Sequence, residues 1–266
     1  MIQVINLQVD IDSFFNRLRG ARQCALLLDY DGTLAPFAIK RDQALPYPGV
    51  RELLDRIAAS GTTRLAVISG RWTRDLIPLL GLRRRLEVWG SHGWERFFPN
   101  GHYEIIEPDA QAMAGLIEAN EWSERIAKLG GRTEQKPASF ALHWRGLNPN
   151  TIAQIHALVD ESWARLAQEA GLEMYPFDGG VELRVPGRDK GLAVDTIRSE
   201  MGDGAMIAYL GDDLTDEDAF HAIKGYGLGV LVRAELRPTL ADLWLRPPGE
   251  LLAFLERWAD SVRKLS

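Results

Sequence analysis

Short apolar runs alternate along the chain with stretches whose apolar residues are spaced as on one face of a helix. The first run is Leu26-Leu27-Leu28, apolar positions at helical spacing follow between residues 50 and 58, and a second run lies at residues 65–68. Uncharged runs of this length are typical of strands buried on both faces of a parallel sheet. The alternation predicts right-handed βαβ units and a doubly wound, mostly parallel sheet of the α/β class.

The pattern changes between about residue 108 and residue 187. Two long helices are predicted here, each followed by two strands: residues 109–129 with 132–136 and 139–145, then residues 149–170 with 172–177 and 180–185. Two such αββ units can form a small antiparallel sheet that is covered by helices. We therefore predict a Rossmann-like core at residues 1–108 and 187–266, with an inserted α+β cap domain at residues 109–186.

Composition and charge narrow the range of partners. The net charge of −6 over 266 residues argues against a nucleic-acid partner, because phosphate backbones select for basic surfaces. The single cysteine, Cys24, excludes an internal disulfide. The chain has no apolar run of the roughly 20 residues that cross a bilayer, and its first residues lack the apolar core of a signal peptide. We expect a cytoplasmic protein without a membrane partner, and a monomer is favoured.

Functional side chains follow the ends of the predicted strands. Asp29 and Asp31 come directly after the first strand, and Gly32 lets the chain turn away. Ligands of open α/β sheets bind at the carboxyl ends of strands, which makes these carboxylates candidates for a site. Taken alone, an Asp-x-Asp-Gly segment is as typical of a polar turn as of a binding site.

Three groups at other strand ends and helix starts favour the site over the turn. They are the hydroxyl of Ser69, the ammonium of Lys190 and the carboxylate of Asp212. One reaction uses this whole set, namely phosphoryl transfer through an aspartyl-phosphate with Mg²⁺ neutralising charge. Mg²⁺ is satisfied by carboxylates, carbonyls and water, so it suits a site without cysteine or histidine.

Four segments of the chain resemble, in order, the motifs of the haloacid dehalogenase (HAD) superfamily, and within it those of the trehalose-6-phosphate phosphatases. The segments are Asp29-Tyr30-Asp31-Gly32-Thr33, Val67-Ile68-Ser69-Gly70-Arg71, Lys190-Gly191 and Gly211-Asp212-Asp213-Leu214-Thr215-Asp216-Glu217-Asp218. Each motif alone is weak, but together they cover almost the entire chain. The resemblance implies a HAD-like core with a cap of two αββ units.

The resemblance also implies roles for single residues. Asp29 would attack phosphorus, and Asp31 would protonate the departing sugar oxygen and then activate water. Mg²⁺ would be held by the Asp29 carboxylate, the Asp31 backbone carbonyl and Asp212. The remaining implied roles are a metal second shell of Asp213 and Asp216, and phosphate binding by Ser69, Gly70 and Lys190.

Substrate selection is expected from the cap. Glu134-Gln135-Lys136 and the segment Gly180-Val181-Glu182-Leu183-Arg184 resemble cap signatures of the trehalose-phosphatases, which assigns sugar binding to Glu134, Lys136 and Glu182. Charged strand residues are more commonly solvated exterior positions, so the family position carries this assignment. Arg71 is equally a substrate-binding residue or a helix cap. The segment Gly90-Ser91-His92-Gly93-Trp94-Glu95 also resembles a family segment, with hinge, substrate contact and fold constraint left open.

These features favour Mg²⁺-dependent hydrolysis of trehalose 6-phosphate in trehalose biosynthesis, with a small sugar phosphate as the partner. Gln135 and Trp144 depart from the acidic residue and the tyrosine that are usual in the family, and this bears on the identity of the sugar. The alternatives are hydrolysis of another glycosyl phosphate, such as sucrose phosphate, glucosylglycerol phosphate or mannosyl-3-phosphoglycerate, phosphomannomutase-like transfer, and a non-catalytic sugar-phosphate-binding domain.

Overall fold

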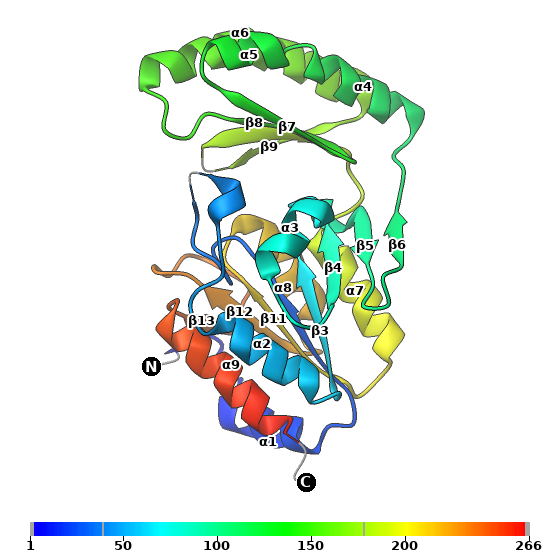
Figure 1. Cartoon of the computed structure of the whole chain (residues 1–266), viewed down its shortest axis with the longest axis vertical. Coiled ribbons are helices and arrows are strands. Elements are labelled where there is room, and N and C mark those ends of the chain that lie inside the picture. Colours follow the sequence, from blue (N-terminus) through cyan, green and yellow to red (C-terminus); the bar gives the residue numbers. More distant parts are fainter. Residues whose placement is uncertain (1–2, 39, 178, 264–266) are drawn as a thin grey trace. The chain divides into compact units, whose positions relative to one another are not determined.

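A computed structural model describes residues 3–38, 40–177 and 179–263. The chain divides into two compact units, one formed by the residues up to Glu104 and from Asp189 onward, the other by Ile105–Arg188. Figure 1 shows the ribbon of both units coloured along the sequence.

The first unit is built on a sheet with the strand order β1-β13-β12-β11-β2-β3-β4-β5-β6. The strands are β1 (Gln3–Val4), β2 (Cys24–Leu28), β3 (Thr63–Ile68), β4 (Glu87–Gly90), β5 (Glu95–Phe97), β6 (Tyr103–Ile105), β11 (Met206–Gly211), β12 (Leu228–Val232) and β13 (Leu243–Leu245). The strands from β13 to β4 pair in parallel, whereas β1 pairs antiparallel with β13 and β5 pairs antiparallel with β4. The predicted α/β class with a doubly wound, mostly parallel sheet is confirmed.

Helices pack on both faces of this sheet (Figure 1). They are α1 (Ile11–Gly20), α2 (Val50–Ala59), α3 (Thr73–Leu80), α7 (Lys190–Met201), α8 (Glu217–Ile223) and α9 (Gly249–Ser261), with short 3-10 turns η1 (Arg41–Gln43), η2 (Ser91–Gly93) and η3 (Leu214–Asp216). Side chains of α1, α2, α3 and α9 form one core, and those of α7 and α8 form the other.

Strand β2 explains why the first apolar run carries no polar residue. Leu26 and Leu28 belong to the core under α1, α2 and α9, whereas Ala25 and Leu27 belong to the core under α7 and α8. Successive side chains of a strand point to opposite faces, so both faces of β2 must be apolar. Cys24, which opens the strand, is also buried. The nucleophile candidate that follows β2 is therefore anchored by packing on two sides.

The second unit contains an antiparallel sheet with the strand order β7-β8-β10-β9. Its elements are α4 (Ala110–Asn120), α5 (Ser123–Lys128), β7 (Arg132–Lys136), β8 (Ser139–His143), α6 (Pro149–Ala170), β9 (Glu173–Phe177) and β10 (Gly180–Arg184). The helices cover one face of this sheet (Figure 1). Phe140, Leu142 and Leu183 are fully buried, as a sheet that packs on helices requires.

One local prediction is wrong, and two short strands were missed. The single helix expected at residues 109–129 is divided into α4 and α5 near Glu121, where the Ser123 hydroxyl donates to Asn120 Oδ1 at 2.8 Å. Asn and Ser have lower helix propensity than Ala, Leu or Glu, which favours an end at this point. Strands β5 and β6 were not predicted, because three residues are too few to show a period.

Candidate active site

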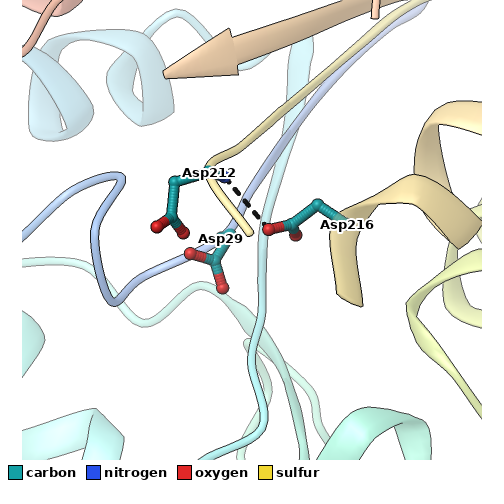
Figure 2. A group of neighbouring side chains, drawn as sticks. All are labelled: Asp29, Asp212 and Asp216. Atoms are coloured by element: carbon teal, nitrogen blue, oxygen red, sulfur yellow. Dashed lines mark hydrogen bonds between the residues drawn. The ribbon is translucent and has the colours of Figure 1, made fainter. Parts of the chain in front are cut away.

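Three buried carboxylates lie together beyond the carboxyl ends of β2 and β11. Asp29 directly follows β2, Asp212 directly follows β11, and Asp216 ends η3. Since β11 pairs with β2, their carboxyl ends share one edge of the sheet. One oxygen from each carboxylate lies within 4.8 Å of the other two, and Figure 2 shows the three side chains around a common point. None of the three is more than 3% exposed, so water screens their mutual repulsion poorly.

Lys190 supplies a cation to this cluster. It is the first residue of α7, and its helix is capped by Asp189, whose side chain accepts from the Leu192 backbone N–H at 2.8 Å. The Lys190 Nζ donates to Asp29 Oδ1 at 2.8 Å and to Asp216 Oδ1 at 2.7 Å. One ammonium thus faces three carboxylates, which leaves an excess of negative charge at the site.

The pKa values reflect this excess charge. Burial, with a contribution from Asp216, raises the pKa of Asp29 to about 7, although Lys190 acts in the opposite direction. Burial and the neighbouring Asp29 also raise the pKa of Asp212 well above its usual range. For Lys190, burial lowers the pKa, but Asp216 and Asp29 together outweigh it and the pKa ends above its ordinary value. A further positive charge would therefore be strongly favoured here.

Asp216 is the most fully hydrogen-bonded of the three carboxylates. Its Oδ1 accepts from Lys190 and from the Tyr209 hydroxyl, while its Oδ2 accepts from the backbone N–H groups of Asp212 and Asp213 at 3.0 and 2.9 Å. The Asp213 side chain in turn accepts from the Leu214 backbone N–H, so the two carboxylates cap η3. These bonds fix the loop that carries Asp212 and occupy both oxygens of Asp216.

The free carboxylate oxygens fit a metal ion. Asp29 Oδ2 is buried, and neither it nor the Asp212 carboxylate has a hydrogen-bond partner within the described part of the chain. The Asp212 carboxylate packs directly against Gly32, whose φ is +87°. A Cβ added at Gly32 would lie 2.1 Å from Asp212 Oδ2, so only glycine leaves space for this carboxylate. Two buried carboxylates with unused oxygens can hold a hard divalent cation. The donor set therefore fits the expected metal.

Arg71 holds Asp31 by a two-point ion pair. Its Nε and Nη2 donate to the two oxygens of Asp31, each at 2.6 Å, and its Nη1 donates to the Arg41 carbonyl at 2.8 Å. Its guanidinium also lies over the Tyr30 ring at 5.5 Å. Arg71 is 4% exposed and Asp31 remains about a quarter exposed at its side chain. Asp31 is thus oriented by a buried cation while still open to solvent.

Ser69 and Gly70 form the turn between β3 and Arg71. The Ser69 backbone N–H donates to the Trp89 carbonyl at 2.8 Å, and the Ser69 hydroxyl accepts from the Arg71 backbone N–H at 3.2 Å. Strand β3 lies beside β2, so this turn is on the same edge of the sheet as Asp29. The structure brings the core candidates together at that edge: Asp29, Asp31, Ser69, Gly70, Arg71, Lys190, Asp212, Asp213 and Asp216.

The candidate sugar-binding residues of the second unit lie on the sheet face opposite the helices. Glu134 and Glu182 occupy one row of the strand register, on either side of Ala141. Lys136 donates to Glu182 Oε1 at 2.6 Å, and both side chains are buried. Glu134 pairs with His143 at 3.2 Å. The face therefore carries alternating acidic and basic groups at short spacing.

Several contributors were not predicted from the sequence. Tyr209, within an apolar strand, bonds Asp216, while Ser139 and Arg184 bond the two oxygens of Glu182 at 2.6 and 2.9 Å. A tyrosine inside a fully buried strand is the one signal that could have indicated the first, because its hydroxyl must find a partner. Ser139 and Arg184 lie within the cap segments that resemble family signatures, but no role was predicted for either side chain.

The arrangement matches a known class of fold. The structure resembles that of a haloacid dehalogenase-like hydrolase from Bacteroides thetaiotaomicron, with a TM-score of 0.64 at 16% identity, over 88% of this chain and 99% of that one. It also resembles trehalose-6-phosphate phosphatase from Aspergillus fumigatus, with a TM-score of 0.66 at 24% identity, over 95% of this chain and 98% of that one. The fold is HAD-like.

The chain belongs to the trehalose-phosphatase family, whose profile matches residues 27–241. It is 32% identical to a trehalose-phosphate phosphatase of Mycolicibacterium paratuberculosis over 92% of the chain and 64% of that protein. It is 34% identical to an uncharacterized glycosyl hydrolase of Mycobacterium tuberculosis over 99% of the chain, yet it spans only 20% of that protein's length.

Within the described ranges, every helix falls short of the length and apolarity that a membrane span requires.

Proposed function

We propose that this protein is a Mg²⁺-dependent phosphatase that hydrolyses trehalose 6-phosphate to trehalose and phosphate. The observation that carries the proposal is the bridge of Lys190 from Asp29 to Asp216, beside the unused oxygens of Asp29 and Asp212. Family membership and the name of the 32% identical relative favour trehalose 6-phosphate as the substrate.

Asp29 is the nucleophile in this proposal. Its carboxylate attacks phosphorus, the bond from phosphorus to the sugar oxygen breaks, and the phosphoryl group is transferred to Asp29. Asp31 gives its proton to the departing sugar oxygen, and the carboxylate so formed then takes a proton from the water that attacks the aspartyl-phosphate. Inorganic phosphate leaves, and both aspartates return to their starting states. Arg71 supports this role because its two hydrogen bonds fix the orientation of Asp31.

The phosphoryl oxygens are held by groups of the same edge. The Ser69 hydroxyl, the Gly70 backbone and the Lys190 ammonium donate to them, and Lys190 also lowers the repulsion between the Asp29 carboxylate and the incoming dianion. Asp29, Asp212 and the Asp31 backbone carbonyl would hold Mg²⁺, with Asp213 and Asp216 positioning the loop around it. When bound, the ion neutralises charge that develops on the transferring group.

Glu134, Lys136 and Glu182 are proposed to bind the sugar hydroxyls. A hydroxyl both donates and accepts, so a face with carboxylates and an ammonium at short spacing can satisfy it from either side. The pair of Lys136 and Glu182 is well suited to this because it is already ordered before substrate arrives. Ordering in advance lowers the entropy cost of binding.

Release of inorganic phosphate from a panel of sugar phosphates tests the proposal. We expect trehalose 6-phosphate to be turned over with the highest kcat/KM, with activity that needs Mg²⁺ and is lost in EDTA. Equal or better turnover of another glycosyl phosphate would overturn the substrate, and binding of trehalose 6-phosphate without phosphate release would replace the enzyme by a sugar-phosphate-binding domain. Transfer of the phosphate to another sugar position would identify a mutase.

A further inference from the structure

The turn η2, which follows β4, has an unusual backbone. Ser91 has a φ of +49° and His92 a φ of +56°, and they are the only non-glycine residues with positive φ among those described. Side chains other than glycine adopt this left-handed region at an energetic cost, and such residues persist only where surrounding contacts hold them. The contacts around η2 therefore indicate the role of its left-handed backbone.

A buried carboxylate holds this turn. Glu95, the first residue of β5, is 1% exposed and accepts only from hydroxyl groups and one backbone N–H in the described chain. Its Oε1 accepts from the Ser91 hydroxyl at 2.5 Å, and its Oε2 accepts from the Thr73 hydroxyl at 2.6 Å and from the Tyr103 hydroxyl at 2.9 Å. The bond to Ser91 ties the strained residue to β5, while the other two fix the carboxylate itself.

The turn η2 is also hydrogen-bonded to the segment Ser69-Gly70-Arg71. The Ser91 backbone N–H donates to the Arg71 carbonyl at 2.8 Å, and the His92 backbone N–H donates to the Ser69 carbonyl at 3.1 Å. The His92 ring packs on Gly70, since a Cβ added there would lie 2.4 Å from His92 Nε2. The left-handed φ of Ser91 turns the peptide that follows it, so it aims the His92 N–H at the Ser69 carbonyl, next to the bond from the Ser91 N–H to the Arg71 carbonyl.

The same turn approaches the residue before Lys190. An added Cβ at Gly93 would lie 3.1 Å from the Asp189 carbonyl oxygen. Asp189 caps the helix that begins at Lys190. One strained turn thus contacts both segments that are proposed to hold the phosphoryl group.

We propose that Ser91, held by Glu95, is a positioning residue: its left-handed backbone aims the His92 N–H, which together with the Ser91 N–H sets the position of the phosphate-binding segment Ser69-Gly70-Arg71. This inference rests on the proposed function of that segment. The role is one of backbone shape and not of contact between the Ser91 hydroxyl and substrate. The sequence leaves three roles open for this turn: hinge, substrate contact and fold constraint. The proposal assigns it a constraint on backbone shape.

Glycine substitution separates shape from chemistry. S91A and S91G both remove the hydroxyl that bonds Glu95, but only glycine adopts a φ of +49° without strain. We expect S91A to lower kcat/KM about tenfold and S91G only about twofold, since the left-handed region costs a non-glycine residue roughly one factor of ten in population. The inhibition constant of inorganic phosphate, which needs only the phosphate subsite, should rise in the same order.

A rescue experiment tests the role of Glu95. E95Q is nearly isosteric, but glutamine has one acceptor oxygen where glutamate has two. It therefore cannot accept from hydroxyls on both sides, and kcat/KM should fall about tenfold. The double variant E95Q/S91G should recover the level of S91G, because glycine holds the turn without the bond. If Glu95 acted only on stability, E95Q would lower the thermal midpoint of unfolding, and E95Q/S91G would not recover kcat/KM.

Ser60 provides matched controls. It directly follows α2 with an ordinary φ of −62°, so S60A and S60G should both keep the wild-type kcat/KM. Equal losses in S91A and S91G would overturn the inference in favour of a direct contact by the hydroxyl. Wild-type kinetics and phosphate inhibition in S91A, or a failure of S91G to rescue E95Q, would overturn it as well. A wild-type protein that releases no phosphate from any sugar phosphate would instead refute the proposed function.

Discussion

Arg71 and Asp31 form a two-point ion pair in which Nε and Nη2 each lie 2.6 Å from one carboxylate oxygen. The pair is anchored from behind, because the remaining guanidinium nitrogen donates to the Arg41 carbonyl. A group that transfers protons must be held within hydrogen-bond reach of the reacting oxygen. The geometry therefore makes Arg71 a determinant of where Asp31 points.

Replacing Arg71 by lysine should separate charge from geometry. R71K keeps the positive charge but cannot make two parallel hydrogen bonds to Asp31. We expect kcat/KM to fall about 10-fold to 100-fold with the fold unchanged, as measured by phosphate release and circular dichroism. R74K is the control, because Arg74 is an exposed arginine in the nearby helix α3 and its change should be silent. Wild-type activity in R71K would show that charge alone is sufficient.

Replacing Asp29 by asparagine should abolish turnover without unfolding the protein. D29N is nearly isosteric and removes the nucleophile, so kcat should fall by a factor on the order of 10³ or more. Burial and the neighbouring carboxylates raise the pKa of Asp29, which means that its charge is unfavourable in the folded state. The thermal midpoint in metal-free buffer should therefore stay equal or rise. A large fall in this midpoint would contradict our account of the charge balance.

Replacing Gly32 by alanine should weaken metal binding. The new Cβ would lie 2.1 Å from Asp212 Oδ2, and the φ of +87° would cost about 1–2 kcal/mol. Because the Asp212 carboxylate must move, the Mg²⁺ concentration that gives half-maximal activity should rise at least about tenfold. G20A is the control, since a Cβ at Gly20 meets no atom within 4 Å. An unchanged Mg²⁺ requirement in G32A would remove Asp212 from the metal site.

Stability should fall in acid through Glu200. This carboxylate accepts from Arg96 at 2.7 Å and from Arg64 at 2.6 Å, and chiefly the hydrogen bonds from Arg96 lower its pKa to about 2. In the unfolded chain the pKa returns to about 4.5, so the unfolded state binds more protons between these values and stability falls as the pH drops from about 4.5 to about 2.

E200Q tests this pH dependence. The variant should be less stable than wild type at pH 7, and the difference in unfolding midpoint should shrink as the pH falls through this window. The effect is modest, because the Glu200 side chain is 40% exposed and solvent screens the pair. E256Q, which changes another exposed glutamate, should show no such convergence. A wild-type advantage that is the same at pH 7 and pH 2.5 would contradict the assignment.

The strand-end rule explains why much of the site could be predicted. Asp29 and Asp212 each follow a fully apolar run, and parallel strands place their carboxyl ends on one edge. Ser69 also follows an apolar strand, whereas Lys190 opens a helix, so its role was indicated by the order of the motifs and not by the strand-end rule. What could not be predicted is the hydrogen bonding that arises only when distant segments meet, such as Glu95 accepting from Thr73 and Tyr103. None of these three positions belongs to a periodic pattern.

The fold shows the same division between periodic and local signals. Long elements such as α6 show several turns of apolar periodicity and could be predicted with their bounds. The break between α4 and α5 coincides with a local side-chain bond from Ser123 to Asn120, and the short strand β5 pairs with β4. Such features are decided by a few contacts, so no average over a window of sequence reveals them.

The lone thiol at the start of β2 has a practical consequence. Burial raises the pKa of Cys24, so the side chain is both shielded and a poor nucleophile at neutral pH. A cysteine introduced at one exposed position in each unit would therefore accept a fluorescent or spin label without background from the native chain. Distances between two such labels, recorded with and without a sugar phosphate, would measure domain motion directly in solution.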